Sequence, residues 1–420
     1  MELGDLATHV RHLESGRQSR RAVVGRLGLG SLAAGLLTTT AAGAVSAQSW
    51  EDLTPDSTPP GAPGNSFPLE GITGGLPPFA FPLEASAPVE YASGAVRWAT
   101  GEQLPTLQGV SMASLRLAPG GMRELHWHLN AHELNVCLAG AGQIGIFAPD
   151  GTSETIDIGP GSITFIPDGY THYIANTGAD ELHLVIAFTH ERLETTDFSQ
   201  ALPAMPTPLL AQVFGVTANQ FPFLATRGDR VLVPLDAPEA GAVAGTPVAA
   251  VPSAYSVTID QLAVTSLTGG TVQPLTDQQI PKLEGVTVFP LSAVPYGLRE
   301  PHWHPNAAEL NYCVSGEAQI GIVAPDGNVQ TFAVNAGDIA YIPRNWFHYI
   351  ANTGDEPLQF LIFFLTPDPH IQTVNLSLTV DHVPASVLAA SFGSDPAAFA
   401  ALPKRGNVGI VPPVGSDQGG

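Results

Sequence analysis

The chain has 420 residues, 44 Gly, 38 Pro, only 13% charged residues and a formal net charge of −22. This length allows two or three domains with their own cores, and the many turn-forming residues favour a β protein over a helical one. The acidic balance argues against nucleic acid as a partner, because phosphate binding needs a basic surface.

Residues 1–47 are predicted to be an export signal. Arg20 and Arg21 precede an apolar stretch that runs through Leu37, and residues 45–47 offer small side chains before a cleavage point. This arrangement resembles a twin-arginine signal, although a Sec-type signal or a membrane anchor remains an alternative. Because the apolar stretch contains Arg26 and many Gly and Ala, we expect no stable membrane span after signal removal. The expected location is periplasmic or extracellular.

The remaining chain is predicted to contain two domains. Residues 48–65 are rich in Pro, Ser and Thr and suggest a linker, which is followed by a first domain over 66–235. The Ala/Gly/Val/Pro-rich residues 236–252 suggest a second linker, and a second domain follows over 253–415.

One set of metal-binding residue types occurs twice, at a constant interval of 176 residues. The first set contains His126, His128, Glu133 and His172, and the second contains His302, His304, Glu309 and His348. A repeat at a fixed interval indicates an internal duplication. Three imidazoles and one carboxylate suit a divalent first-row metal and leave two positions of an octahedral ion open, so we expect two metal sites. The ligand set also accepts Fe, Co, Ni, Cu and Zn, so it does not fix the metal.

Short runs of β-branched and apolar residues, broken by turn signals, predict an all-β sandwich or barrel in each repeat. Examples are residues 143–147 and 162–167. Segments of helical character, Leu209 to Phe223 and Ala385 to Leu402, are expected after each barrel.

Strand geometry predicts how the ligands meet. Residues two apart share a face, so His126 and His128 point inward and Trp127 points outward. After a turn, Glu133 is expected on the neighbouring strand, and His172 on a later strand that closes the site. Cys137 and Cys313 occupy equivalent positions in separate repeats, so we expect buried free thiols and no disulfide.

At these residues the chain resembles the cupins. The first cupin motif matches Gly120, His126, His128, Glu133 and Gly140, and the second matches Gly161, Pro167, Gly169, His172 and Asn176. The resemblance implies two tandem cupin barrels, of the double-stranded β-helix or jelly-roll type, with short flanking helices. In the second repeat Tyr296 and Asn345 replace motif glycines, which puts loop shape in question more than metal binding.

Within the cupins, the chain is similar to the oxalate decarboxylase family. Residues 123–128 and 299–307 follow that family's signature, and the similarity extends from about residue 88 to 405. It implies a lyase with Mn²⁺ at both sites and O2 as co-catalyst, which converts oxalate to formate and CO2. Cupin relatives also imply a homo-oligomer, a trimer or hexamer.

The resemblance also assigns catalytic residues. Arg123 and Arg299 would balance substrate charge at the two sites, although strict strand alternation points Arg123 away from the metal unless a bulge intervenes. In the family, a Glu on a mobile lid after the first repeat protonates the carbon that remains once CO2 has left. Glu194 stands at this position, and Glu191 is the alternative. The second site has Ile362 where the family has a second Glu, so turnover is expected at the first site.

Two other functions remain open. A metal-binding or storage bicupin would retain the metal ligands but catalyse no reaction. An oxalate oxidase or a dioxygenase would catalyse a different reaction on the same scaffold. Formate as a product, peroxide as a product, or bound metal without turnover would distinguish the three.

Overall fold

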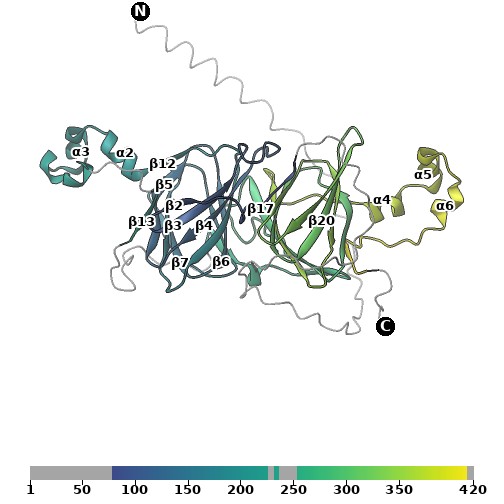
Figure 1. Ribbon diagram of the computed structural model, residues 1–420. Coiled ribbons are helices and arrows are strands. Elements are labelled where there is room, and N and C mark those ends of the chain that lie inside the picture. The colour runs from purple at the N-terminus through teal and green to yellow at the C-terminus, as the bar shows by residue number, and fades with distance from the viewer. Residues whose placement is uncertain (1–77, 226–230, 236–252, 414–420) are drawn as a thin grey trace, which may run out of the picture. The chain divides into compact units, whose positions relative to one another are not determined.

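The structure is a computed structural model that describes residues 78–225, 231–235 and 253–413 (Figure 1). The expected export signal and both expected linkers lie outside the described residues. Within them the predicted all-β class is confirmed. Most elements are short strands paired in antiparallel order, blue to teal in domain 1 and green in domain 2 (Figure 1).

Domain 1 is built from two sheets. The first runs in the order β14 (Ser256–Thr258), β9 (Ser162–Ile166), β6 (Glu133–Ala139), β11 (Leu182–Phe188), β4 (Ser111–Leu117), β3 (Gly94–Ala99) and β2 (Val89–Tyr91). The second runs in the order β12 (Thr195–Asp197), β5 (Gly121–His128), β10 (Thr171–Asn176), β7 (Gly142–Phe147) and β8 (Ser153–Ile158), and β13 (Leu232–Pro234) also pairs with β5.

Domain 2 repeats this plan. Its first sheet has the order β1 (Ala80–Phe81), β22 (Ile339–Ile342), β19 (Ala308–Ser315), β24 (Leu358–Leu365), β17 (Val286–Ala293), β16 (Gly270–Val272) and β15 (Thr265–Leu267). Its second sheet has the order β21 (Val329–Asn335), β20 (Glu317–Val323), β23 (Phe347–Asn352), β18 (Leu298–Trp303) and β25 (Val374–Asn375), and β26 (Ile410–Val411) pairs with β18.

Apolar side chains from both sheets form the core of each domain. In domain 1 these include Leu115, Ile144, Ile174, Leu184 and Ile186, all buried. Burial of such side chains drives each pair of sheets together, at roughly 1.5–3 kcal/mol for each large aliphatic residue. The core fixes the sheets that carry the predicted ligands.

The two domains exchange short strands, which the sequence did not indicate. β1 lies ahead of the domain 1 strands in the chain but pairs with β22 of domain 2. β14 lies at the start of the second repeat, after residues 236–252, but pairs with β9 of domain 1. Backbone hydrogen bonds therefore connect the two repeats in both directions.

Glu84 strengthens this connection just after β1. One carboxylate oxygen accepts hydrogen bonds from the hydroxyl of Tyr312 in domain 2 (3.3 Å) and from His183 in domain 1 (3.2 Å), and the other binds Arg116 (3.0 Å). Burial alone would raise the pKa of Glu84, but the hydrogen bond and charge of His183, the hydroxyl of Ser114 and the charge of Arg116 lower it to about 2. The carboxylate is therefore ionised across the physiological pH range.

The two replaced motif glycines keep the glycine conformation. Gly120 and Gly169 of domain 1 have φ of 70° and 73°, and Tyr296 and Asn345 of domain 2 have φ of 56° and 68°. Asn adopts this left-handed region readily, whereas a Tyr there is a strained exception. Loop shape is thus preserved despite the substitutions.

Helices follow each barrel, as the sequence predicts. They are α2 (Phe198–Ala204), α3 (Thr207–Phe214), η2 (Ala218–Gln220) and η3 (Pro222–Ala225) in domain 1, and α4 (Leu376–His382), α5 (Ala385–Phe392) and α6 (Pro396–Ala400) in domain 2; η4 (Ile259–Gln261) follows β14. Among the described residues no helix is long and apolar enough to span a bilayer. Cys137 and Cys313 are buried and free, which confirms the expected thiols.

Candidate metal centres

Strand β5 presents two of the first site's residues on one face. His126 and His128 are buried and the intervening Trp127 is half-buried, which is the alternation expected of a strand. His172, on β10, lies directly opposite His126 in the antiparallel register. In domain 2, His302 of β18 lies opposite His348 of β23 in the same way.

Glu133 comes from the facing sheet, and the expectation that it lies on the neighbouring strand is wrong. It is the first residue of β6, which pairs with β9 and β11, whereas β5 pairs with β10, β12 and β13. Residues 129–132 therefore cross between the two sheets and do not form a hairpin turn within one sheet. This crossing places the carboxylate against the imidazoles from across the barrel.

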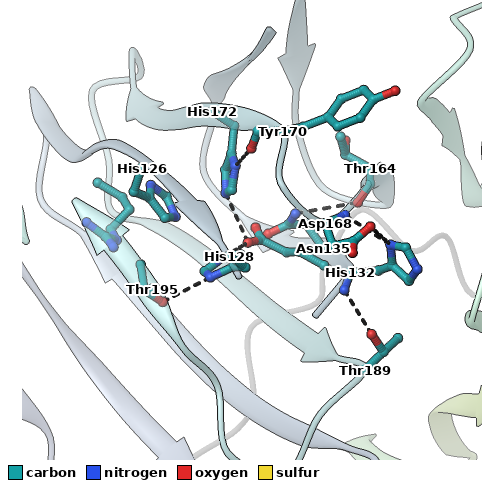
Figure 2. Close-up of polar contacts among 12 residues, drawn as sticks. His126, His128, His132, Asn135, Thr164, Asp168, Tyr170, His172, Thr189 and Thr195 are labelled. Atoms are coloured by element: carbon teal, nitrogen blue, oxygen red, sulfur yellow. Dashed lines mark hydrogen bonds and ion pairs between the residues drawn. The ribbon is translucent and has the colours of Figure 1, made fainter. Parts of the chain in front are cut away.

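Two four-residue clusters result, and each contains the residues that the sequence singles out. His126, His128, Glu133 and His172 form one, and His302, His304, Glu309 and His348 form the other. In each, one ligand atom per residue lies within 4.8 Å of all the others, and all eight residues are buried. Figure 2 shows the three domain 1 imidazoles converging from their strands.

Backbone carbonyls orient the imidazoles. Nδ1 of His126 lies 2.7 Å from the carbonyl oxygen of Glu124, and Nδ1 of His172 lies 2.9 Å from that of Tyr170. A carbonyl can only accept, so each Nδ1 carries the proton and each Nε2 lone pair faces the cluster. Such contacts fix the tautomer that binds a metal. In domain 2, His302 and His348 make the same contacts with the carbonyls of Glu300 and Trp346.

The third imidazole of each site is oriented by the segment that follows the barrel. Nδ1 of His128 lies 2.9 Å from Oγ1 of Thr195 on β12 (Figure 2). Nδ1 of His304 lies 3.1 Å from the carbonyl oxygen of Gln372 and 3.1 Å from Oγ1 of Thr373. The sequence analysis did not identify Thr195 or Thr373 as site residues.

The protonation states suit metal binding. Burial, and then the nearby charge of His172, holds the pKa of His126 well below its usual value. Burial acts to raise the pKa of Glu133, but the adjacent imidazoles of His172 and His128, whose Nε2 atoms lie 3.1 and 2.7 Å from its Oε2, bring it well below its usual value. The pKa of Glu309 is lowered for the same reasons, by His348 and His304. Neutral imidazoles and ionised carboxylates are the states that coordinate cations.

The residues present fit a divalent metal. Oε1 of Glu133 is buried and has no hydrogen-bond partner among the described residues, and Nε2 of His304 lies 3.1 Å from Oε2 of Glu309. A buried polar atom without a partner is costly, and a cation at the centre of the domain 1 cluster would satisfy Oε1 of Glu133. Nitrogen and carboxylate donors of this kind accept Mn²⁺ and other first-row divalent ions.

Arg123 faces the first site because β5 contains a bulge. His172 pairs with His126 and Ile174 with Arg123, so two residues of β5 stand opposite one residue of β10. The extra residue reverses the alternation of side chains between the two faces of β5. A bulge of this kind was expected to be necessary for the Arg123 guanidinium to point toward the metal ligands. Nη2 of Arg123 lies 2.6 Å from Oδ1 of Asp197, an acid that the sequence analysis did not single out.

A cavity of about 200 Å³ opens at this site. Its polar lining comes from three ligands and three other residues, namely His126, His128, Glu133, Arg123, Thr195 and Asp197. Its apolar lining includes Trp98, Leu115, Ile174, Ile186 and Phe188. The volume equals that of roughly seven water molecules in the liquid, so a ligand of a few heavy atoms fits beside a metal.

Arg299 differs from Arg123 in one of its two partners. Both donate to a backbone carbonyl, that of Val231 for Arg123 (3.3 Å), but Arg299 has an amide where Arg123 has an acid. A register shift between Arg299 and His302 repeats the bulge, but the guanidinium binds Oδ1 of Asn375 and the carbonyl of Gly409, both at 3.0 Å. Burial lowers the pKa of Arg299 to about 10, and the charges of Glu309 and Glu300 act to raise it. Arg299 therefore stays protonated at neutral pH. Ile362 is buried within β24.

The two candidate acids of the lid lie outside the cavity lining. Glu194 is exposed, and its backbone is held by Asn130 and Leu129 through hydrogen bonds of 2.9 Å. Glu191 accepts a hydrogen bond from the backbone of Gly109. Glu194 directly precedes β12, which pairs with the ligand strand β5, so the acid lies one residue from Thr195.

The two-sheet barrels and their clusters define a duplicated metal-binding β-barrel protein. The model of the Cupin family matches residues 82–221 and 259–398, so the chain belongs to the cupin family and is a bicupin.

Oxalate decarboxylases are among the most similar individual relatives. The chain is 29% identical to an oxalate decarboxylase of Bacillus subtilis over 300 residues, which cover 71% of this chain and 77% of that protein. It is 28% identical over 301 residues to a probable oxalate decarboxylase of Arthroderma benhamiae, covering 69% of this chain and 72% of that protein. A solved structure of the Bacillus subtilis enzyme at pH 4.6 superposes with a TM-score of 0.73 and 26% identity over 82% of this chain and 90% of that one. The expected similarity to this family is confirmed.

Proposed function

We propose that this protein is an exported, manganese-dependent oxalate decarboxylase-like bicupin that converts oxalate to formate and CO2 at the domain 1 site. The observation that carries the proposal is the domain 1 cavity, where the ligand cluster and Arg123 line the same space. The similarity to oxalate decarboxylases supports the substrate. A related solved structure concerns Mn(II) centres in the Bacillus subtilis enzyme, which supports the metal.

In this account each domain 1 side chain has one task. His126, His128, Glu133 and His172 would hold Mn²⁺, which would supply a Lewis acid for a substrate carboxylate. Arg123 binds and orients the carboxylate from the cavity wall through its remaining guanidinium donors. The apolar lining, which includes Trp98 and Phe188, limits water around the reacting carbon.

The reaction needs a proton. Oxalate loses CO2 by cleavage of its C–C bond, and the carbon that remains must gain a proton to become formate. We assign this proton to Glu194, which has to move toward the cavity together with β12. Its exposed position and its attachment through Asn130 are consistent with a lid segment that opens and closes. O2 as co-catalyst belongs to the same proposal, and turnover should stop under nitrogen.

Domain 2 is proposed to have a structural or regulatory role. The buried Ile362 cannot transfer a proton. We also propose a trimer or hexamer, by similarity to cupin relatives, and sedimentation would test this.

The experiment is incubation of the Mn²⁺-loaded protein with oxalate under air, with formate and hydrogen peroxide both assayed. Formate at near-stoichiometric yield with consumption of one proton per oxalate supports the decarboxylase. Peroxide as the product would replace it with an oxidase. Bound metal with neither product would replace it with a metal-binding or storage bicupin.

Export through the twin-arginine route is part of the proposal, because a chain that folds in the cytoplasm can bind Mn²⁺ before it meets copper and zinc. Affinity for those metals is higher in the Irving–Williams order, so the compartment of folding decides occupancy. Replacement of Arg20 and Arg21 by Lys should retain the chain in the cytoplasm. Export that persists in this variant and requires the Sec pathway would reject the route.

A further inference from the structure

The buried surroundings of the two metal sites differ by one charged side chain. Asp197 pairs with His126 across β12 and β5, and Asn375 pairs with His302 across β25 and β18, so the two residues occupy equivalent positions. Asp197 binds the guanidinium of Arg123 as an ion pair at 2.6 Å, whereas Asn375 offers Arg299 a neutral amide oxygen at 3.0 Å.

Other buried charges near the sites are matched. The exposed lid acid Glu194 has the neutral Gln372 as its counterpart, since each donates its backbone N–H to an Asn side chain, that of Asn130 or Asn306. Glu124 lies next to Arg123 in sequence and accepts hydrogen bonds from Ser199, and Glu300 lies next to Arg299 and accepts them from Ser377. The ligand sets are identical as well. With one divalent ion in each, the buried groups of the domain 1 site carry one unit less positive charge than those of the domain 2 site, and Asp197 is the cause.

This difference acts where solvent screens it weakly. The side chains of Arg123 and Asp197 are only 11% and 10% exposed, and both line the domain 1 cavity with the metal ligands. A buried ion pair leaves little net positive potential on the guanidinium, and a nearby carboxylate repels a second negative charge. A doubly charged anion in this cavity would therefore lie close to the Asp197 carboxylate.

We propose that Asp197 is a specificity-determining residue that restricts the domain 1 site to singly charged carboxylates, such as formate or the hydrogen oxalate ion. The inference rests on the proposed function for the carboxylate class of ligand. Asn375 leaves the domain 2 site without this restriction.

The test compares the affinities of a doubly and a singly charged ligand. Full-length, Mn²⁺-loaded protein is titrated calorimetrically under nitrogen at pH 7, once with oxalate and once with formate, and metal content is measured before and after. Asp197→Asn keeps the side-chain shape and removes the charge. It should raise the ratio of oxalate to formate affinity by about tenfold or more. Repeating both titrations in the His302→Ala background, which leaves only the domain 1 ligand set intact, assigns the change to domain 1.

Asp180→Asn is the matched control, because it makes the same change in net charge at an exposed position and should leave the ratio unaltered. A purely structural role of Asp197 would change both affinities by the same factor, and this result would overturn the proposal. So would an unchanged ratio, or no anion binding in any variant. Formate production is not needed for the titration. A shifted ratio without turnover would thus reject the decarboxylase and retain the role of Asp197.

Discussion

The hydroxyl of Thr195 lies 2.9 Å from Nδ1 of His128. The lid segment that carries Glu194 is thereby connected to the metal-ligand set by one hydrogen bond. A movement of β12 that brings Glu194 toward the cavity would also change the orientation of the His128 ring. Lid position and metal affinity are therefore expected to depend on each other.

Thr195→Ala should weaken metal binding at domain 1. The substitution removes the contact that fixes the His128 ring, and losses of this kind lower affinity by about 10- to 100-fold. Competition between the protein and a chelator for Mn²⁺ would measure the change. Thr196→Ala is the control, because Thr196 pairs with Trp127 and is absent from the cavity lining. Equal affinity in both variants would contradict the role of Thr195.

Glu194→Gln should reduce formate production by about 100-fold or more, since general acids of this type contribute that amount. The bound Mn²⁺ content should not change, because Glu194 is exposed and outside the ligand cluster. Glu191→Gln is the comparison, and it should retain most of the activity. If Glu191→Gln alone stops turnover, the assignment of the acid moves to that residue.

Glu84→Gln should lower the free energy of unfolding at pH 7 by about 3 kcal/mol. The estimate follows from a pKa lowered from 4.5 to about 2. Because the folded-state pKa is the lower one, this stabilisation is complete above about pH 4.5 and is lost as the pH falls toward 2.

Urea denaturation of the wild type and the variant at several pH values would test this, and the two curves should converge in acid. Glu181→Gln is the control, because Glu181 binds the same Arg116 but its side chain is 53% exposed. A constant difference between wild type and Glu84→Gln down to pH 2 would show that Glu84 stabilises the fold by other means.

Gly120→Ala should lower the free energy of unfolding by about 1 kcal/mol, because a Cβ strains the left-handed backbone. An added Cβ would meet only Leu235 at 3.8 Å, so steric overlap is not the cause. Gly159→Ala, at a glycine without positive φ and with open space around it, should be neutral or slightly stabilising. Thermal unfolding of both variants would measure their stabilities. Equal losses of stability would show that the positive φ of Gly120 is not the cause.

The sequence predicted the ligands well because the duplication doubles each signal. His126 and His302, with their partners, repeat at one interval, and strand alternation places such residues on one face. The predicted position of Glu133 was wrong because residues 129–132 are compatible with either a hairpin turn or a crossing between sheets. Only the pairing of β6 with its neighbouring strands distinguishes the two.

Other features depend on contacts that no local pattern reports. The bulge that turns Arg123 inward is one extra residue opposite β10, and the exchanged strand β1 pairs with a strand about 260 residues away. Asp197 was overlooked because it stands next to the assigned lid position and matches no motif. Its contact with Arg123 spans 74 residues of sequence.

The most direct test of the account compares oxalate turnover after removal of each metal site. His126→Ala and His302→Ala each remove one ligand from one cluster, and both variants are assayed for bound Mn²⁺ and for formate after incubation with oxalate under air. We expect His126→Ala to abolish formate production, and we expect His302→Ala to lose one metal and to continue producing formate. Formate from His126→Ala at the wild-type rate, with His302→Ala inactive, would contradict the assignment of the chemistry to domain 1.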